Sequence, residues 1–366
     1  MFSVLNLYIL KRFLISFFLV IVTLSLILFV GDFVEQFRKA TAKNVPLNVI
    51  FQLSALNFPN LIFFTLPITA FFSSVIAYLI LIRNSEKIII DTVGISNFKI
   101  SIPVFALYLF IGYFFITIAN PLISILDEKY SELEYKYIDK VDKFASITKN
   151  GIWLKQDNDQ TKLSSVLYAK KISNQGKNLH DFMMLEYDHS GAFQGRLDGR
   201  SAELDNGYWI MNDIQISPKY GNSFFKDDFK YKTNIKLEDI ADSLSSPSSI
   251  PIWRLIKFIN LLEGLGYSAI DFKMHFYDLM FLPIYLAALS LLASSLVLNL
   301  KQNDKYSITL TYSFLLIFII YFFSNLLDAL GSTGQIHPII SKCLMPIMIV
   351  ILSAAIYYFT NLNKRR

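Results

Sequence analysis

Six long uncharged apolar stretches constrain this chain more than any other feature. A helix rises about 1.5 Å per residue, so roughly 18 to 20 apolar residues cross the ~30 Å hydrocarbon core of a bilayer. A soluble core accounts for one or two such stretches, but not for six in 366 residues of which 54% are hydrophobic. The sequence therefore predicts a polytopic α-helical membrane protein with six transmembrane helices. The predicted spans are residues 13–31, about 59–82, 100–126, 279–300, 306–327 and 343–363.

The segment between the third and fourth spans has a different pattern. It is charged, and short stretches of alternating apolar residues are separated by turn pairs such as Asp198-Gly199 and Asn206-Gly207. Such pairs are typical of β-hairpins. Several short antiparallel strands at this spacing predict an all-β sandwich or an open barrel. The predicted strands are 151–156, 163–173, 180–188, 192–205, 208–217 and 228–237.

The strand over 208–217 carries a further expectation. Its even positions are mostly apolar, although Asn212 interrupts them. Because side chains alternate between the two faces of a strand, these positions predict one shared apolar face. The residues on it are Tyr208, Ile210, Ile214 and Ile216.

Lys and Arg in the short connecting segments predict the orientation in the membrane, since cytoplasmic loops are enriched in these residues. With a cytoplasmic N-terminus, ten of them lie inside and three outside, which places both termini in the cytoplasm and the inserted domain on the far side. The inside set is Lys11, Arg12, Arg83, Lys87, Lys99, Lys301, Lys305, Lys364, Arg365 and Arg366, and the outside set is Arg38, Lys39 and Lys43. The first apolar stretch is too long for a signal peptide, and no small-residue cleavage site follows it.

Composition argues against several classes of function. The net charge of +5 is accounted for by the cytoplasmic loops and tail, so it does not indicate nucleic-acid binding. Cys343 is the only cysteine and lies in the last span, and the four His residues are scattered, so no metal site is expected. No Gly-Lys-Ser/Thr phosphate loop, nucleophile elbow or HExxH motif occurs, and no catalytic residues are predicted.

The energy source is constrained by where the charges lie. Ion-coupled transporters keep ionisable groups deep in their helices, whereas Asp278, Asp328 and Lys342 all lie at the boundaries of the predicted spans. A transporter with neither an ion path nor a nucleotide site needs an external motor. The cytoplasmic link 83–99 is a plausible attachment point, because Ser85 as a cap, an apolar Ile88–Ile90 ridge and Gly94 as a stop predict a helix of about two turns. The alternative is a surface loop lying in the lipid headgroups.

These features together resemble the YjgP/YjgQ permeases, the LptF and LptG subunits of the lipopolysaccharide exporter, and the details are more similar to the G-type than to the F-type. The resemblance runs nearly end to end and includes the order of three spans, an external domain and three spans. The residues that carry it are Phe33-Val34-Glu35-Gln36, Arg38-Lys39-Ala40, Ser85-Glu86, Gly94, Gly151-Ile152-Trp153, Pro283, Leu327-Asp328, Gly331, Gly334 and Pro338. Three positions depart from the family pattern: Asp32, Leu279 and Lys342.

The resemblance implies an architecture and a set of partners. The fold is six transmembrane helices with an inserted all-β, jellyroll-like periplasmic domain between helices three and four. Residues 1–126 would hold the first three helices with a cytoplasmic coupling helix at about 84–95, residues 127–270 the periplasmic domain with helical flanks, and residues 271–366 the last three helices. The partners would be a paralogous six-span subunit, cytoplasmic ATPase subunits that use ATP, periplasmic lipid-bridge proteins and lipopolysaccharide. This chain itself would hold no cofactor.

The resemblance and the residues together suggest two candidate sites. The ATPase-coupling site is expected at Arg83, Ser85, Glu86, Lys87, Ile90, Asp91 and Gly94. The substrate site is expected to combine basic groups near the outer surface with apolar side chains, at Phe33, Phe37, Arg38, Lys39, Lys43, Phe318, Tyr321, Ile210 and Ile214. The alternatives are interfacial anchoring for the basic residues and plain packing for the aromatic ones.

The function expected from the sequence is a permease subunit of an ABC transporter that extracts lipopolysaccharide from the bacterial inner membrane and passes it to a periplasmic bridge. One alternative is a non-transporting scaffold or sensor whose outer domain binds an envelope partner. A permease of the efflux or lipoprotein-release type usually carries its outer domain after the first span, so the position of the insert disfavours that class.

Overall fold

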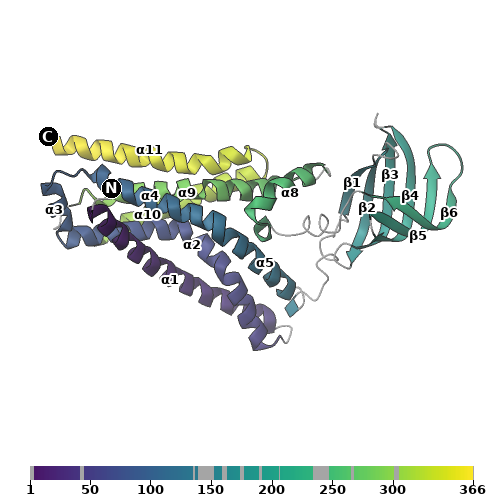
Figure 1. The fold of residues 1–366 in the computed structure, drawn as a ribbon, viewed down its shortest axis with the longest axis horizontal. Helices are drawn as coiled ribbons and strands as arrows, with labels where there is room; N and C mark the ends of the chain where they lie inside the picture. Colours follow the sequence, from purple (N-terminus) through teal and green to yellow (C-terminus); the bar gives the residue numbers. More distant parts are fainter. Residues whose placement is uncertain are drawn as a thin grey trace. The chain divides into compact units, whose positions relative to one another are not determined.

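A computed structural model of the chain consists of two compact units, residues 1–130 with 270–366, and residues 131–269. It describes residues 4–41, 45–134, 137–138, 152–158, 163–173, 177–188, 192–205, 207–233, 247–264, 268–300 and 305–365. Figure 1 shows the helices of the first unit and the sheet of the second. The predicted turn residue Asn206, the last predicted strand beyond Thr233, and Lys301 lie outside the described residues.

The first unit contains six helices long and apolar enough to span a membrane, which confirms the predicted number. The first two are α1 (Val4–Thr41) and α2 (Leu47–Arg83). The third is one continuous helix with three labels: α4 (Asn97–Phe114), η1 (Phe115–Ala119) and α5 (Asn120–Glu134). The last three are α9 (Ile270–Val297), α10 (Tyr306–Ser332) and α11 (Pro338–Arg365). A short helix, α3 (Glu86–Thr92), joins α2 to α4.

Two of these helices extend beyond the apolar stretches that predict them. Residues 47–58, which precede the predicted second span, form the beginning of α2, which continues through Pro59 and Pro67. The third span contains one π-helical turn, η1, before it continues as α5. An extra residue in a helical turn locally widens the helix.

The centre of the helical unit is formed by α2 and α9. In their most apolar segments 67% and 61% of the residues are buried, against 17% for α10. α9 packs against α2, α4, α10 and α11, while α1 packs mainly on α2 (Figure 1). α10 therefore presents most of its surface outward, including Phe314 and Phe318, which are exposed by 65% and 66%.

The closest approach between α4 and α9 occurs at Gly112. A Cβ atom built on this glycine would lie 2.5 Å from Cα of Pro283, which is backbone and cannot turn aside. Small residues at helix interfaces in membranes allow this kind of close packing. Gly112 thus sets the spacing of two helices that are separated by more than 150 residues in sequence.

The described part of the second unit is built on six antiparallel strands that form one sheet in the order of the sequence. The inserted domain is therefore all-β, as predicted, and the described strands form an open curved sheet rather than two facing sheets. The strands are β1 (Ile152–Asn158), β2 (Leu163–Ser173), β3 (Asn178–Asp188), β4 (Phe193–Asp205), β5 (Tyr208–Pro218) and β6 (Phe224–Lys232). The short helix η4 (Pro247–Ser249) and α8 (Ile252–Gly264) follow.

A row of irregular residues bends this sheet. Asp181 on β3 and Asp213 on β5 have positive φ values of 51° and 52°, and both flank Arg200 on β4 in the strand register. On β5, Trp209 and Met211 are buried before the row, and Ile214 is buried after it. The alternation of buried side chains therefore shifts by one position at Asp213.

Because of this shift, the prediction that the even positions of 208–216 share one apolar face is wrong. Ile214 belongs to the buried core of the sheet, but Tyr208 is exposed and Ile210 is only half-buried. The physical reason is the left-handed backbone at Asp213, which breaks the strict alternation of a regular strand. The core consists of Leu167, Ala169, Leu179, Phe182, Met184, Leu197, Ala202, Leu204, Trp209, Met211, Ile214 and Tyr231.

Glu186 on β3 carries a partly desolvated carboxyl. Burial raises the pKa of this carboxyl above its ordinary value.

Replacing Gly112 by Leu should destabilise the helical unit by on the order of 1 to 3 kcal/mol, because α4 and α9 must move apart. Thermal unfolding of the purified full chain in detergent measures this effect. The matched control is Gly31→Leu on α1, where an added Cβ meets nothing within 4 Å. Equal stability of the two variants would show that the α4–α9 contact does not limit the fold.

Glu186→Gln should flatten the pH dependence of the stability of the β-unit. Because the folded-state pKa is raised, the contribution of Glu186 is fully present below its ordinary value of 4.5 and is lost as the pH rises through the folded pKa. The variant should therefore be more stable than the parent chain at pH 7. Pulse proteolysis in urea, scored by cleavage within residues 152–232, measures this, with the exposed Asp228→Asn as control. A parallel pH profile for parent and variant would contradict the prediction.

Candidate functional site

The link between α2 and α4 is built from two left-handed residues around one short helix. Ser85 has a φ of +61° and makes no capping hydrogen bond with its side chain, so the expectation that Ser85 caps the helix is wrong. It turns the chain instead. Gly94 has a φ of +78°, a conformation that glycine adopts without strain. After it, Ser96 caps α4 by accepting a hydrogen bond from the backbone N–H of Lys99.

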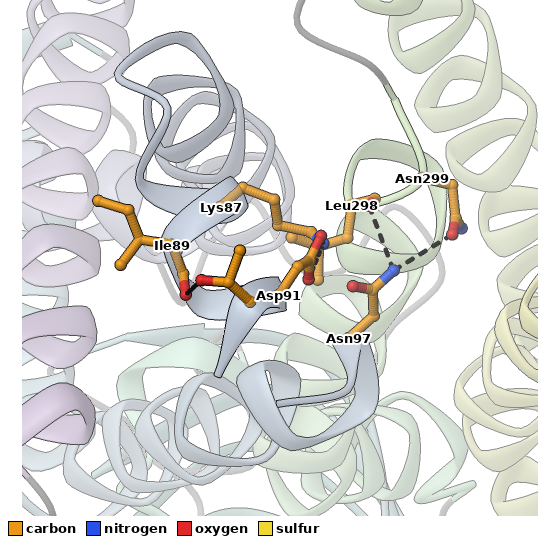
Figure 2. Close-up of polar contacts among 7 residues, drawn as sticks. Lys87, Ile89, Asp91, Asn97, Leu298 and Asn299 are labelled. Atoms are coloured by element: carbon orange, nitrogen blue, oxygen red, sulfur yellow. Dashed lines mark hydrogen bonds and ion pairs between the residues drawn. The ribbon is translucent and has the colours of Figure 1, made fainter. Parts of the chain in front are cut away.

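One face of α3 is directed at the rest of the chain. Ile90 and Lys87 are buried, and Lys87 Nζ lies 2.6 Å from the carboxylate of Asp91. Figure 2 shows this pair, together with Asn97 at the start of α4. The side-chain amide of Asn97 donates to the carbonyl of Leu298 and to Oδ1 of Asn299, both at 3.2 Å. The link is thereby attached to the end of α9.

The N-terminal end of α3 is attached to α1. Arg12 on α1 forms an ion pair with Glu86 at 2.5 Å, and its guanidinium also donates to the hydroxyl of Tyr8. Asn84 donates to the same carboxylate oxygen of Glu86 at 3.1 Å. Both charged side chains are largely covered, with 29% and 21% of their surfaces exposed.

The exposed face of α3 carries an apolar ridge. Most of the expected coupling residues contact their own chain. Glu86 pairs with Arg12, and Lys87 pairs with Asp91. Ile90 is buried, and Arg83 is the last residue of α2. The apolar side chains turned outward are Ile88, Ile89 and Val93, which are exposed by 51%, 64% and 71%. Asp91 and Thr92 are exposed beside them. Ile89 and Val93 are four residues apart and therefore share one side of the helix. In the predicted Ile88–Ile90 ridge, Ile88 and Ile89 are exposed, whereas Ile90 is buried.

The expected substrate residues on α1 lie around the end of that helix. Arg38 is exposed, Phe37 is exposed by 45% and Phe33 is half-buried, while Lys39 pairs with Glu35 at 3.2 Å. The neighbouring polar residues fix the helix end: Asn57 donates to Asp32 and Gln36 donates to Tyr130, both at 2.8 Å. Lys43 lies outside the described residues.

The two expected substrate residues on α10 have different environments. Phe318 is exposed, whereas Tyr321 lines a cavity inside the helical unit and stacks edge-on against Phe64 of α2 with ring centroids 6.1 Å apart. Ile210 and Ile214 belong to the other unit, where they occupy different environments on β5.

The structure also brings together three charges that the sequence left apart. Lys342 Nζ on α11 lies 3.0 Å from Asp278 on α9 and 2.9 Å from Asp328 on α10. Each of them was expected at the boundary of a span, but no contact between them was predicted. One feature of the sequence could have indicated this group: all three residues fall at the same end of three consecutive spans.

Comparisons with known proteins cover almost the whole chain. The family described as lipopolysaccharide export system permease LptF/LptG matches residues 7–359. The chain is also 23% identical over 362 residues to the lipopolysaccharide export system permease protein LptG of Haemophilus influenzae, an alignment that covers 96% of this chain and 97% of that protein. Six apolar helices interrupted after the third by a β-domain agree with the architecture that the resemblance implies. The chain therefore belongs to the LptF/LptG family of lipopolysaccharide export permeases.

Proposed function

We propose that this chain is the G-type permease subunit of an ABC transporter that extracts lipopolysaccharide from the inner membrane and passes it to a periplasmic bridge. The observation that carries the proposal is α3: a short helix with a buried inner face and an exposed apolar outer face, attached to the bundle at both ends. An exposed apolar ridge on a polar loop is a common mark of a protein-binding surface. The partner for this surface is the cytoplasmic ATPase.

The orientation of the chain follows from its basic residues. The ten-to-three distribution of Lys and Arg in the short segments supports cytoplasmic termini. In that orientation α3 faces the cytoplasm, where ATP is available, and the β-unit is periplasmic. The sequence lacks a phosphate-binding loop, so ATP is used by the partner subunit.

Apolar surfaces suited to acyl chains lie on the helices that the proposal needs. A cavity of about 590 Å³ between α1, α2 and α4 is lined, apart from Ser25, by apolar side chains such as Phe17, Phe58 and Phe110. Arg38, at the outer end of α1, supplies an exposed guanidinium, which binds phosphate groups well. The outward surface of α10 around Phe318 is available to lipid or to the paralogous six-span subunit. The β-unit, whose sheet has an apolar core, is the proposed route to the bridge proteins.

The Arg12–Glu86 pair is the proposed connection between the motor and the lipid path. α1 carries Arg12 near its inner end and Phe33, Phe37 and Arg38 near its outer end. A displacement of α3 by the ATPase is passed to α1 through a largely covered ion pair. Covered pairs of this kind hold their geometry better than exposed ones.

Ile89→Ser should abolish copurification of the ATPase while the chain still inserts and still binds its paralogous subunit. The expected cause is the loss of an exposed apolar contact of the ridge. Affinity purification from the native membrane, followed by quantification of both partners, measures this. Phe98→Ser is the matched control, because Phe98 is also exposed, by 60%, but lies on α4. If the parent chain brings down no ATPase and no paralogue, a scaffold or sensor role replaces the transporter.

Reversing the charge of one member of the Arg12–Glu86 pair should uncouple ATP turnover from the lipid. Arg12→Glu alone and Glu86→Arg alone should each lower lipid-stimulated ATP turnover by about tenfold, corresponding to about 1.4 kcal/mol, and the double variant should recover most of it. The ATPase should copurify with all three, because the ridge is unchanged. Full activity of the single variants, or no recovery in the double variant, would falsify the connection.

A further inference from the structure

A cavity of about 500 Å³ lies among α2, α9, α10 and α11, in addition to the surfaces used above. Its charged lining consists of Lys342, Asp278 and Asp328, which come from three different helices. All three lie toward the same end of the bundle: Asp278 in the first third of α9, Asp328 four residues before the end of α10, and Lys342 four residues after the start of α11. The charged part of the cavity therefore lies toward that end of the bundle.

The charges in this cavity do not balance. Two carboxylates face one ammonium, and among the described lining residues Lys342 is the only Lys or Arg. With His275 counted as neutral, one negative charge remains. Lys342 is held tightly, with 13% of its side chain exposed, whereas Asp278 keeps 50% of its side chain exposed. The surplus negative charge is therefore accessible on the Asp278 side.

A fastening of three helices accounts for both ion pairs of Lys342, but not for the charge that is left over. Two carboxylates and one ammonium leave one negative charge at the boundary of the spans, on the half-exposed side of Asp278. This charge gives the cavity an attraction for a cation.

The remaining lining specifies what kind of cation fits. Phe64, Phe281, Tyr285 and Tyr321 line the same cavity, and aromatic faces attract ammonium groups while also packing against apolar chains. His275 lines it too, and its Nε2 is buried without a hydrogen-bond partner among the described residues. The volume is in the range of sites for small organic ligands.

We propose that this cavity binds the primary ammonium group of a membrane amphiphile, with Asp278 and Asp328 as its anionic partners. Lys342 holds the two carboxylates in place, and the aromatic side chains cover the apolar part of the ligand. The site is distinct from the apolar cavity on α1, and its occupation does not depend on the transport proposal.

Two photoactivatable single-chain probes that differ only in their headgroup, a primary alkylamine and the corresponding alcohol, test this on the full chain in its purified complex. The amine probe should label peptides around residues 278–285 and 321–328 about tenfold more than the alcohol probe. This comparison uses the parent protein, so it does not depend on any variant folding. Equal labelling by the two probes would overturn the proposal and leave the three charges as a fastening between helices.

Asp278→Asn provides the second test. It should lower amine labelling to the level of the alcohol probe and leave alcohol labelling unchanged, because the apolar lining is intact. Asp271→Asn is the matched control: it removes the same charge from the first turn of α9, outside the cavity. An unchanged amine preference in Asp278→Asn, with a folded protein by size exclusion, contradicts the assignment of the carboxylates.

Discussion

Close packing around α9 is the interaction on which the helical unit depends. Lipid gives helices no hydrophobic reason to associate, so small residues and side-chain hydrogen bonds must hold them together. α9 supplies both. Tyr357 of α11 is hydrogen-bonded to Ser294 of α9 at 2.5 Å and to Ser101 of α4 at 2.8 Å, so one hydroxyl joins three helices. The small buried residues of α9 are Ala287, Ala288, Ser290, Ala293, Ser294 and Ser295.

The short helix α3 extends this arrangement to the end of the bundle. Glu86 joins it to α1, Lys87 and Ile90 bury its inner face, and Asn97 joins the following helix to the end of α9. A link attached in this way is unlike a mobile loop. Polar contacts of 2.5 to 3.2 Å connect α3 and the start of α4 to α1 and to the end of α9. Under the proposed function, these contacts let a helix of seven residues serve as the coupling element.

The spans and the inserted β-domain could be predicted because their signals are local. Apolar length determines which segments cross a bilayer, and alternation determines which form strands. The bend at Asp213 could not, since a left-handed aspartate leaves no mark in the hydropathy pattern, and Ile210 was therefore assigned to the wrong face. Likewise Glu86 looked available for a partner protein until Arg12, 74 residues away, was seen beside it. The group around Lys342 was missed for the same reason: pairing between helices depends on packing, which spacing along one helix does not reveal.

The contact between Gly112 and Pro283 has a consequence for how the chain is made. During synthesis the first three spans emerge well before α9, so the surface of α4 around Gly112 is uncovered while residues 131–269 are being added. The β-unit has its own buried core and does not need α9 to form it. Domains generally fold as units in the order of synthesis. The inserted domain is thus positioned to fold before the membrane bundle closes around α9, and the surface of α4 at Gly112 stays uncovered during that interval.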